Sequence, residues 1–241
     1  YASTGEVKGP GERIEEVRRR YEEGFRSVKL RVHDFDVRED IRQVEAVAKS
    51  FGDRMKIGVD ANQGWRVTIV NDAPLWDLKR AGYFADACAD LGVAWIEEPL
   101  PMDDYDSLSA LAAYSKVPIS GGELHSSGLP ELRMMIERKC YHIFQPDAVM
   151  AGGIGHTMEV VRLCREHDLL YSPHTWTNGI GFAINLQMFI ASRFTDRMTL
   201  EYPFNPPSWT AEKRDGLLTQ PFFHQEGRLV PPTLPGLGFE I

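Results

Sequence analysis

The chain has 241 residues, of which 43% are hydrophobic and 26% charged, with a formal net charge of −8 and three cysteines. These fractions are typical of a folded globular protein, and no apolar run approaches the ~18 residues of a membrane span. The acidic balance argues against nucleic-acid binding, so we expect a small-molecule partner. The cysteine spacing fits neither a disulfide framework nor a zinc site, so we expect a cytoplasmic protein.

Short apolar runs alternate with longer amphipathic stretches along the chain, which is typical of repeated βα units. A first helix is expected after Gly11 and ends at Gly24, and a strand follows over residues 27–32. The next unit has a helix over 41–51 and a strand over 56–60. Further strands are predicted at 93–96, 117–120, 142–145, 169–172 and 198–201, with helices between them at about 76–91, 105–115, 129–138, 154–167 and 180–192.

The seven predicted strands, with a helix in each interval between them, indicate parallel pairing through right-handed crossovers. Either a doubly wound open sheet or a TIM-like (β/α) barrel fits this order, and a barrel typically takes ~250 residues. The α/β rhythm stops after Glu201. We therefore predict an α/β domain over 1–201 and an irregular C-terminal segment over 202–241 that packs on it.

Polar residues follow almost every predicted strand. Lys29 and Arg31 lie on one face of the first of these strands, because residues two apart point the same way. The later strand ends carry Asp60, Glu97, Glu123, Asp147, His174 and Glu201. In an open sheet these side chains would be spread along a line, whereas in a barrel they converge on one mouth. The pattern therefore favours the TIM-like barrel.

Three of these residues, Asp60, Glu97 and Glu123, come from successive strands. Clustered carboxylates without a counter-charge repel one another, and an all-oxygen ligand set favours Mg²⁺ over zinc. Alternatively, each could cap a helix or pair with an arginine. Because all three occupy matching positions, we predict that they bind Mg²⁺.

Asp147 and His174 follow adjacent predicted strands. A carboxylate that contacts an imidazole orients it and raises its basicity, so this pair could act as a general base. His125 lies just beyond Glu123 and could face a substrate. The remaining histidines are interpreted as structural: His33, His142, His156, His167 and His224.

Taken together, these residues resemble the enolase superfamily and, within it, the mandelate racemase-like group of acid-sugar enzymes. The resemblance runs from about residue 12 to the C-terminus. The stretches that carry it are Lys29-Leu-Arg31, Val59-Asp-Ala-Asn-Gln63, Trp95-Ile-Glu-Glu-Pro99, Gly121-Gly-Glu123, Gln145-Pro-Asp147 with Gly152-Gly153, Ser172-Pro-His174 and Leu200-Glu201.

The resemblance implies a barrel enzyme that removes the proton α to a carboxylate. It implies that Asp60, Glu97 and Glu123 hold Mg²⁺ and that His174 with Asp147 is the general acid/base. Lys29 and Glu201 would contact the substrate carboxylate and its developing charge. Glu98, the second glutamate of its pair, would not be a primary ligand.

Arg31 departs from the pattern, because many relatives have a second lysine there. Arginine, with a pKa above ~12, does not act as a base near neutral pH. Racemisation between two opposed bases is therefore disfavoured, and His174 is the expected base with Lys29 and Arg31 as cationic clamps. We predict an acid-sugar dehydratase acting on an aldonate or aldarate; a racemase, epimerase or cycloisomerase, or a non-catalytic barrel, are the alternatives.

The chain begins Tyr1-Ala-Ser3, not with methionine. We interpret these residues as the tail of a largely missing first strand, and expect that the working enzyme includes a preceding N-terminal domain that closes over the barrel mouth. Relatives commonly assemble, so a homo-oligomer is also expected. Trp176 and Asn178 could line the pocket, although Trp176 could equally be a packing residue. Residues 66–75 could be a surface elaboration or an interface.

Overall fold

The computed structural model describes residues 1–241, which form eight strands and eight helices. The strands are β1 (Ala2–Ser3), β2 (Ser27–Arg31), β3 (Lys56–Asp60), β4 (Trp95–Glu97), β5 (Ile119–Gly121), β6 (Ile143–Phe144), β7 (Leu170–Tyr171) and β8 (Tyr202–Pro203). The helices are α1 (Pro10–Glu22), α2 (Val37–Phe51), α3 (Leu78–Asp90), α4 (Tyr105–Tyr114), α5 (Leu129–Glu137), α6 (Gly153–Glu166), α7 (Gly179–Ser192) and α8 (Ala211–Arg214). None of the helices is long and apolar enough to cross a bilayer.

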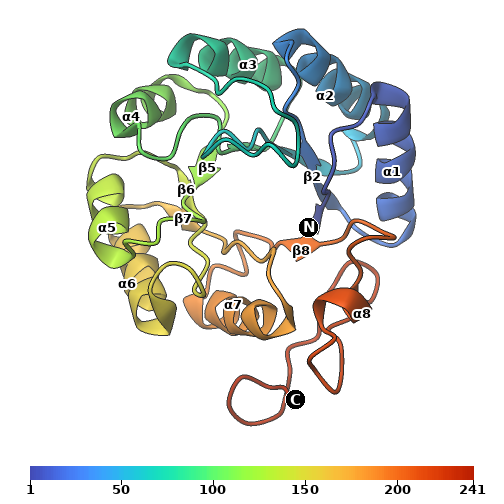
Figure 1. Ribbon diagram of the computed structural model, residues 1–241, viewed down its shortest axis with the longest axis vertical. Helices are drawn as coiled ribbons and strands as arrows, with labels where there is room; N and C mark the ends of the chain where they lie inside the picture. The colour runs from blue at the N-terminus through green and yellow to red at the C-terminus, as the bar shows by residue number, and fades with distance from the viewer.

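All strands pair in parallel in one sheet, in the order β7-β6-β5-β4-β3-β2-β1-β8. The sheet curls, and helices α1 to α7 lie around its outside (Figure 1). The backbone ladder is open between β7 and β8, although the Ser172 hydroxyl donates to the Thr199 carbonyl across this gap at 2.9 Å. This α/β architecture is consistent with the predicted TIM-like barrel.

Beyond the seven predicted strands, the structure has an eighth, at the position where the sequence placed the tail of a first strand. Ala2 and Ser3 form β1, which pairs with both β2 and β8, so the expected missing strand is not confirmed. The last strand also lies at Tyr202–Pro203 rather than at 198–201. The two residues of β8 are too few to show a periodicity of two, so the sequence pattern placed this strand a few residues too early.

The C-terminal segment after β8 contains the one-turn helix α8, and is otherwise largely irregular. Phe222 and Leu229 from this segment pack against the main core. The division of the chain into a domain over 1–201 and a segment over 202–241 stays a prediction.

Several helices begin at a side chain that caps their first free amides. Asp36, Asp77 and Asp104 accept a hydrogen bond from a backbone amide in the first turn of α2, α3 and α4, respectively. Asn178 does the same for α7 at Gly181. Such caps satisfy amides that have no partner within the helix, and they fix where each helix starts above its strand. Asn178 is therefore a cap, not a pocket residue.

Two apolar clusters fill the fold. The larger one lies between the helices and the sheet, and it contains all three cysteines, which are free and buried. The smaller one joins Tyr1, Trp95 and Ile143 near the N-terminal ends of the strands. A β-carbon at Gly58 would lie 2.1 Å from the Trp95 ring, so only glycine lets this ring pack against β3. The charged site residues lie above this small cluster, toward the C-terminal ends of the strands.

Replacing Phe84 with alanine is expected to lower the free energy of unfolding by about 3–5 kcal/mol, because its ring leaves a cavity in the larger cluster. Phe84 is fully buried on α3, and its ring packs edge-on against Trp76 with centroids 4.9 Å apart. Urea denaturation would measure the loss. Tyr83, its 54% exposed neighbour, is the control, because its replacement with alanine should change stability by less than about 0.5 kcal/mol. Equal effects of the two changes would contradict this packing.

Candidate active site

Strand register brings the first polar residues together. Arg31 is the pairing partner of Asp60, and Asp60 is the partner of Glu97. Each of the three residues ends its strand, so their side chains share one edge of the sheet. Glu123, Asp147 and His174 lie two or three residues beyond β5, β6 and β7, respectively. The structure therefore gathers these six residues at the C-terminal side of the strands. Glu201, which the sequence placed at the end of a strand, instead directly precedes β8.

Lys29 lies at the centre of this group. Its ammonium is 2.7 Å from Glu201 and 3.4 Å from Asp60, and it also forms an ion pair with Glu97. Burial lowers the pKa of Lys29, but the surrounding carboxylates, Glu201 first, outweigh it and raise this pKa well above its usual value. These contacts hold Lys29 as a cation. The same contacts hold the pKa of Glu201 at about 2, against the opposing effect of burial.

The carboxylates outnumber the cations beside them. Burial, reinforced by Asp60 and opposed by Lys29, raises the pKa of Glu97 to about 8. Burial also raises the pKa of Glu123, although His174 acts in the opposite direction. An excess of buried carboxylate oxygens is a donor set that suits a hard divalent cation such as Mg²⁺.

The side chains are not, however, arranged as a ligand cluster, because no three His, Cys, Asp or Glu side chains are placed to hold one ion. Lys29 bonds one oxygen of Glu97, and the Gln145 amide donates to the other at 2.7 Å. Asp60 accepts from the Asn62 backbone at 2.9 Å. The metal set thus stays a prediction, supported by the donor chemistry and the charge excess.

His174 and Asp147 form the expected pair. The Nδ1 atom of His174 lies 3.0 Å from an Asp147 oxygen, and its Nε2 atom lies 3.5 Å from Glu123. Burial lowers the pKa of His174, but Glu123, Asp147 and Glu201 outweigh it and raise this pKa to about 10. Asp147 thus fixes the imidazole through Nδ1, while Nε2 faces Glu123.

Asn185, a residue that the sequence reading missed, orients this pair. It lies fully buried on α7, donates to Asp147 at 2.8 Å and accepts from the Ala148 amide at 3.0 Å. The Val149 amide also donates to Asp147, at 2.9 Å. The available signal was a polar residue that interrupts the apolar stretch of α7.

Replacing Asn185 with alanine is expected to lower the free energy of unfolding by about 1–3 kcal/mol, because Asp147 and the Ala148 amide each lose a buried partner. It should also lower kcat without a matching rise in KM, since His174 loses its fixed orientation. Urea denaturation and steady-state kinetics would measure the two effects. A variant with unchanged stability and kcat would show that Asn185 does not position the pair.

Arg31 is the second cation of the site. Its guanidinium binds the Asn62 side-chain carbonyl and lies 3.6 Å from Asp60. It also lies over the ring of Trp176, 5.6 Å from the ring centroid. The indole of Trp176 is itself held by a hydrogen bond to the Ser3 hydroxyl at 2.8 Å. Of the two roles that the sequence left open for Trp176, lining the pocket and packing, the structure has both: Trp176 lines the cavity and stacks on Trp209.

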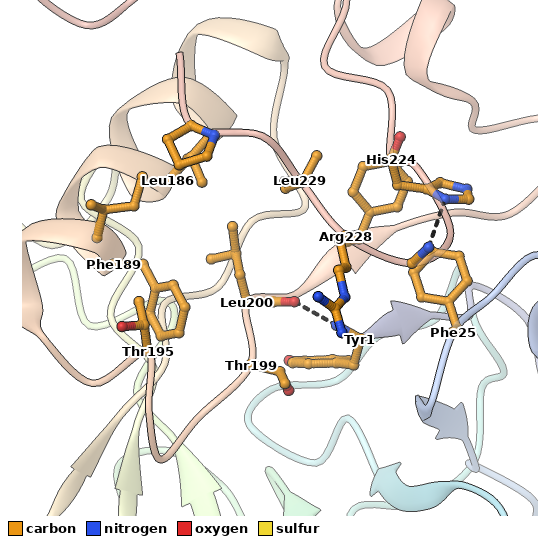
Figure 2. A pocket seen from close by; sticks show the side chains of 14 residues that line it. Tyr1, Phe25, Leu186, Phe189, Thr195, Thr199, Leu200, His224, Arg228 and Leu229 are labelled. Carbon is orange, nitrogen blue, oxygen red and sulfur yellow. Dashed lines mark hydrogen bonds between the residues drawn. The ribbon is translucent and has the colours of Figure 1, made fainter. Parts of the chain in front are cut away.

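A cavity of about 430 Å³ opens over this group, and Lys29, Asp60, Glu123 and His174 line it. A second cavity, of about 360 Å³, lies beside residues that precede β1, β2 and β8: Tyr1, Phe25 and Leu200 (Figure 2). There the α-amino group of Tyr1 donates to the Leu200 carbonyl at 2.6 Å. The second cavity contains no carboxylate and none of the predicted site residues, so the chemistry belongs to the first.

His125 does not line the cavity, although its position next to Glu123 suggested that it could. Its Nδ1 atom lies 2.9 Å from Glu131 on α5, which also accepts from the Tyr105 hydroxyl at 2.8 Å. It ties the loop after β5 to the surrounding helices. Residues 66–75, interpreted from the sequence as an elaboration or an interface, contribute Val67, Ile69 and Val70 to the cavity wall.

Known proteins resemble this chain in sequence and in fold. The enolase C-terminal domain-like family matches residues 12–241. The D-galactarolactone cycloisomerase of Agrobacterium fabrum is 29% identical to this chain, and the match covers 94% of this chain and 57% of the relative. The L-talarate/galactarate dehydratase of Salmonella typhimurium is 28% identical, and the match covers 91% of this chain and 48% of the relative. The structure of L-talarate dehydratase from Polaromonas sp. JS666, complexed with Mg and L-glucarate, matches with a TM-score of 0.81 at 26% identity, covering 100% of this chain and 60% of that one. The chain spans about half the length of the curated relatives it matches.

Proposed function

Because this chain belongs to the enolase superfamily, in its mandelate racemase-like group, we propose that it carries the active site of a Mg²⁺-dependent acid-sugar dehydratase. The observation that carries this proposal is the geometry of His174. One ring nitrogen is fixed by Asp147, and the residue borders a cavity that Lys29, Asp60 and Glu123 also line. This places a proton acceptor beside groups that stabilise an anion.

His174 takes the proton from C2 of the substrate through Nε2, while Asp147 stabilises the imidazolium that forms. The C2–H electron pair moves toward the carboxylate, where the cations Lys29 and Arg31 stabilise the enediolate. The imidazolium then returns its proton to the hydroxyl on C3, which leaves as water. The resulting enol tautomerises to a 2-keto-3-deoxy acid.

Mg²⁺ held by Asp60, Glu97 and Glu123 would polarise the substrate carboxylate. It would also offset the negative charge of Glu123, which raises the pKa of His174, and so would leave His174 neutral and able to accept the C2 proton. The Mg²⁺ complex of the Polaromonas relative supports this proposal. The solved and curated relatives are longer than this chain, so we also propose that activity requires a further domain over the cavity mouth. Assembly into a homo-oligomer stays a prediction.

The product distinguishes dehydration from isomerisation. A panel of aldonates and aldarates, incubated with the full-length protein and Mg²⁺, is expected to give a 2-keto-3-deoxy acid, detected by NMR as a new CH₂ group. A product isomeric with its substrate would instead support the cycloisomerase chemistry of the Agrobacterium relative. Two-base racemisation has less support, because Lys29 is held as a cation between carboxylates.

A further inference from the structure

A buried arginine that the proposed reaction does not use lies behind the candidate site. Arg13 is on α1, which lies outside β2 and next to α2 (Figure 1), and its side chain is fully buried. A charge is costly to bury unless it is paired and hydrogen-bonded. One partner is Glu16 on the same helix, but the four other hydrogen bonds of Arg13 leave the helix.

These bonds join the loop after β1, the end of β2 and helix α2. Nε of the buried guanidinium donates to the Gln43 side chain at 2.6 Å, and Nη1 donates to the Thr4 hydroxyl at 2.9 Å. Nη2 donates to the carbonyls of Glu6 and Arg31, the latter at 3.2 Å. With the bond to Glu16, each N–H of the guanidinium has an acceptor, which the three donors of a lysine could not reproduce.

The segments that Arg13 joins are those that hold Arg31. The Arg31 carbonyl also accepts from the Gln43 amide at 3.3 Å, and the Arg31 Nε atom donates to the Thr4 carbonyl at 3.3 Å. The amide and the hydroxyl of Thr4 both donate to the Lys29 carbonyl, at 3.1 Å and 2.8 Å. Arg31 lines the cavity, and its Nη2 atom donates to no protein group, so one donor of Arg31 is left for a ligand.

The other cation of the site depends less on this support. The ammonium of Lys29 contacts three carboxylates. The polar contacts of the Arg31 guanidinium are the Thr4 carbonyl, the Asn62 side chain and, at 3.6 Å, Asp60. A shift of the loop after β1 would therefore displace Arg31 more than Lys29.

We propose, building on the proposed function, that Arg13 is a positioning residue that fixes the guanidinium of Arg31 for the substrate carboxylate. Arg13 does not line the cavity, and it acts through the backbone of residues 4–6 and of Arg31. A misplacement of about 1 Å caused by a residue away from the chemistry can cost about 10²-fold in rate. Because Arg31 would bind both the carboxylate and the enediolate, the loss should appear in KM as well as in kcat.

A double-mutant cycle tests whether Arg13 acts through Arg31. Arg13→Met removes the guanidinium, while Glu16 keeps Lys8 as a partner at 2.9 Å. For the sugar acid that the full-length protein converts with Mg²⁺, kcat/KM is expected to fall by about 10²-fold. In an Arg31→Met background, the same change should cost less than about threefold, because its effect passes through Arg31.

Two further variants separate positioning from a loss of stability. Arg20→Met is the control, because Arg20 lies on the same helix, is 4% exposed and pairs with Glu23 at 3.1 Å. It should lower the stability of the fold but leave kcat/KM within about twofold of the wild type. If Arg13→Met does not fold, Gln43→Met removes one bond to Arg13 and one to Arg31 without changing a charge. It should lower kcat/KM on the order of tenfold, again only where Arg31 is present.

NMR of the arginine side chains needs no substrate and so separates this proposal from the proposed function. In full-length protein labelled with ¹⁵N-arginine, the Arg31 Nε–H signal is identified by its loss in Arg31→Met. Its exchange with water should become about tenfold faster in Arg13→Met, or in Gln43→Met if Arg13→Met does not fold, because the Thr4 carbonyl no longer holds it in place.

An unchanged exchange rate, the full 10²-fold loss in the Arg31→Met background, or an equal loss of kcat/KM in Arg20→Met would overturn the positioning role. If no sugar acid is converted, the proposed dehydratase function fails, and the exchange rate alone decides whether Arg13 positions Arg31.

Discussion

Replacing His174 with asparagine is expected to lower kcat by about 10²- to 10⁴-fold, the usual contribution of a positioned general acid or base. Asparagine cannot accept the C2 proton, but it is close to histidine in size and can still donate to Asp147. The fold should therefore persist, and the substrate Kd should change little, because Lys29 and Arg31 still meet the carboxylate. Steady-state kinetics, together with circular dichroism of the variant, would measure this.

His167 offers a matched control. It is exposed at the end of α6 and lies outside the cavity lining, so His167→Asn should retain full turnover. Wild-type turnover by His174→Asn would remove His174 from the reaction and, with it, the mechanism proposed above.

Replacing Glu97 with glutamine is expected to lower kcat/KM on the order of 10³-fold, because a bound cation contributes several kcal/mol to stabilising the developing charge. Glutamine keeps the size of the side chain but removes its charge and one oxygen donor. The same variant should bind Mg²⁺ more weakly, and calorimetric titration of Mg²⁺ without substrate measures that loss directly.

Glu137→Gln is the control for this change, because Glu137 is exposed at the end of α5. The control should match the wild type in Mg²⁺ affinity and in activity. An unchanged Mg²⁺ affinity in the Glu97 variant would show that the carboxylate excess around Lys29 does not serve a divalent cation.

Much of the fold follows from the sequence because its signals are local. The apolar runs at 27–32 and 56–60 are long enough to identify β2 and β3, and most helices have a side-chain cap or an apolar stripe. The two-residue strands β1 and β8 depend on pairing with each other and with β2, which no local pattern records. That is why the sequence indicated only the tail of a first strand and displaced the last one.

In the candidate site, too, some features could be predicted from local sequence and others could not. Parallel strands direct their carboxyl ends to one side, so the positions of Asp60, Glu97 and His174 alone predicted that they gather. The contacts between the side chains could not be predicted from the sequence, because they depend on how far each side chain extends. Lys29 extends to three carboxylates, and Asn185 contacts Asp147 from a helix. The cavity wall at 65–70 was likewise invisible, because an irregular connection has no periodicity.

Proton NMR in D₂O tests the central claim, abstraction of the C2 proton by His174, most directly. With Mg²⁺ and an accepted sugar acid, the wild-type protein should consume the C2–H signal and form a 2-keto-3-deoxy acid that carries a solvent deuteron at C3, whereas His174→Asn should do neither. Deuterium exchange at C2 without loss of water would contradict the dehydration, and exchange by His174→Asn at the wild-type rate would contradict the role of His174.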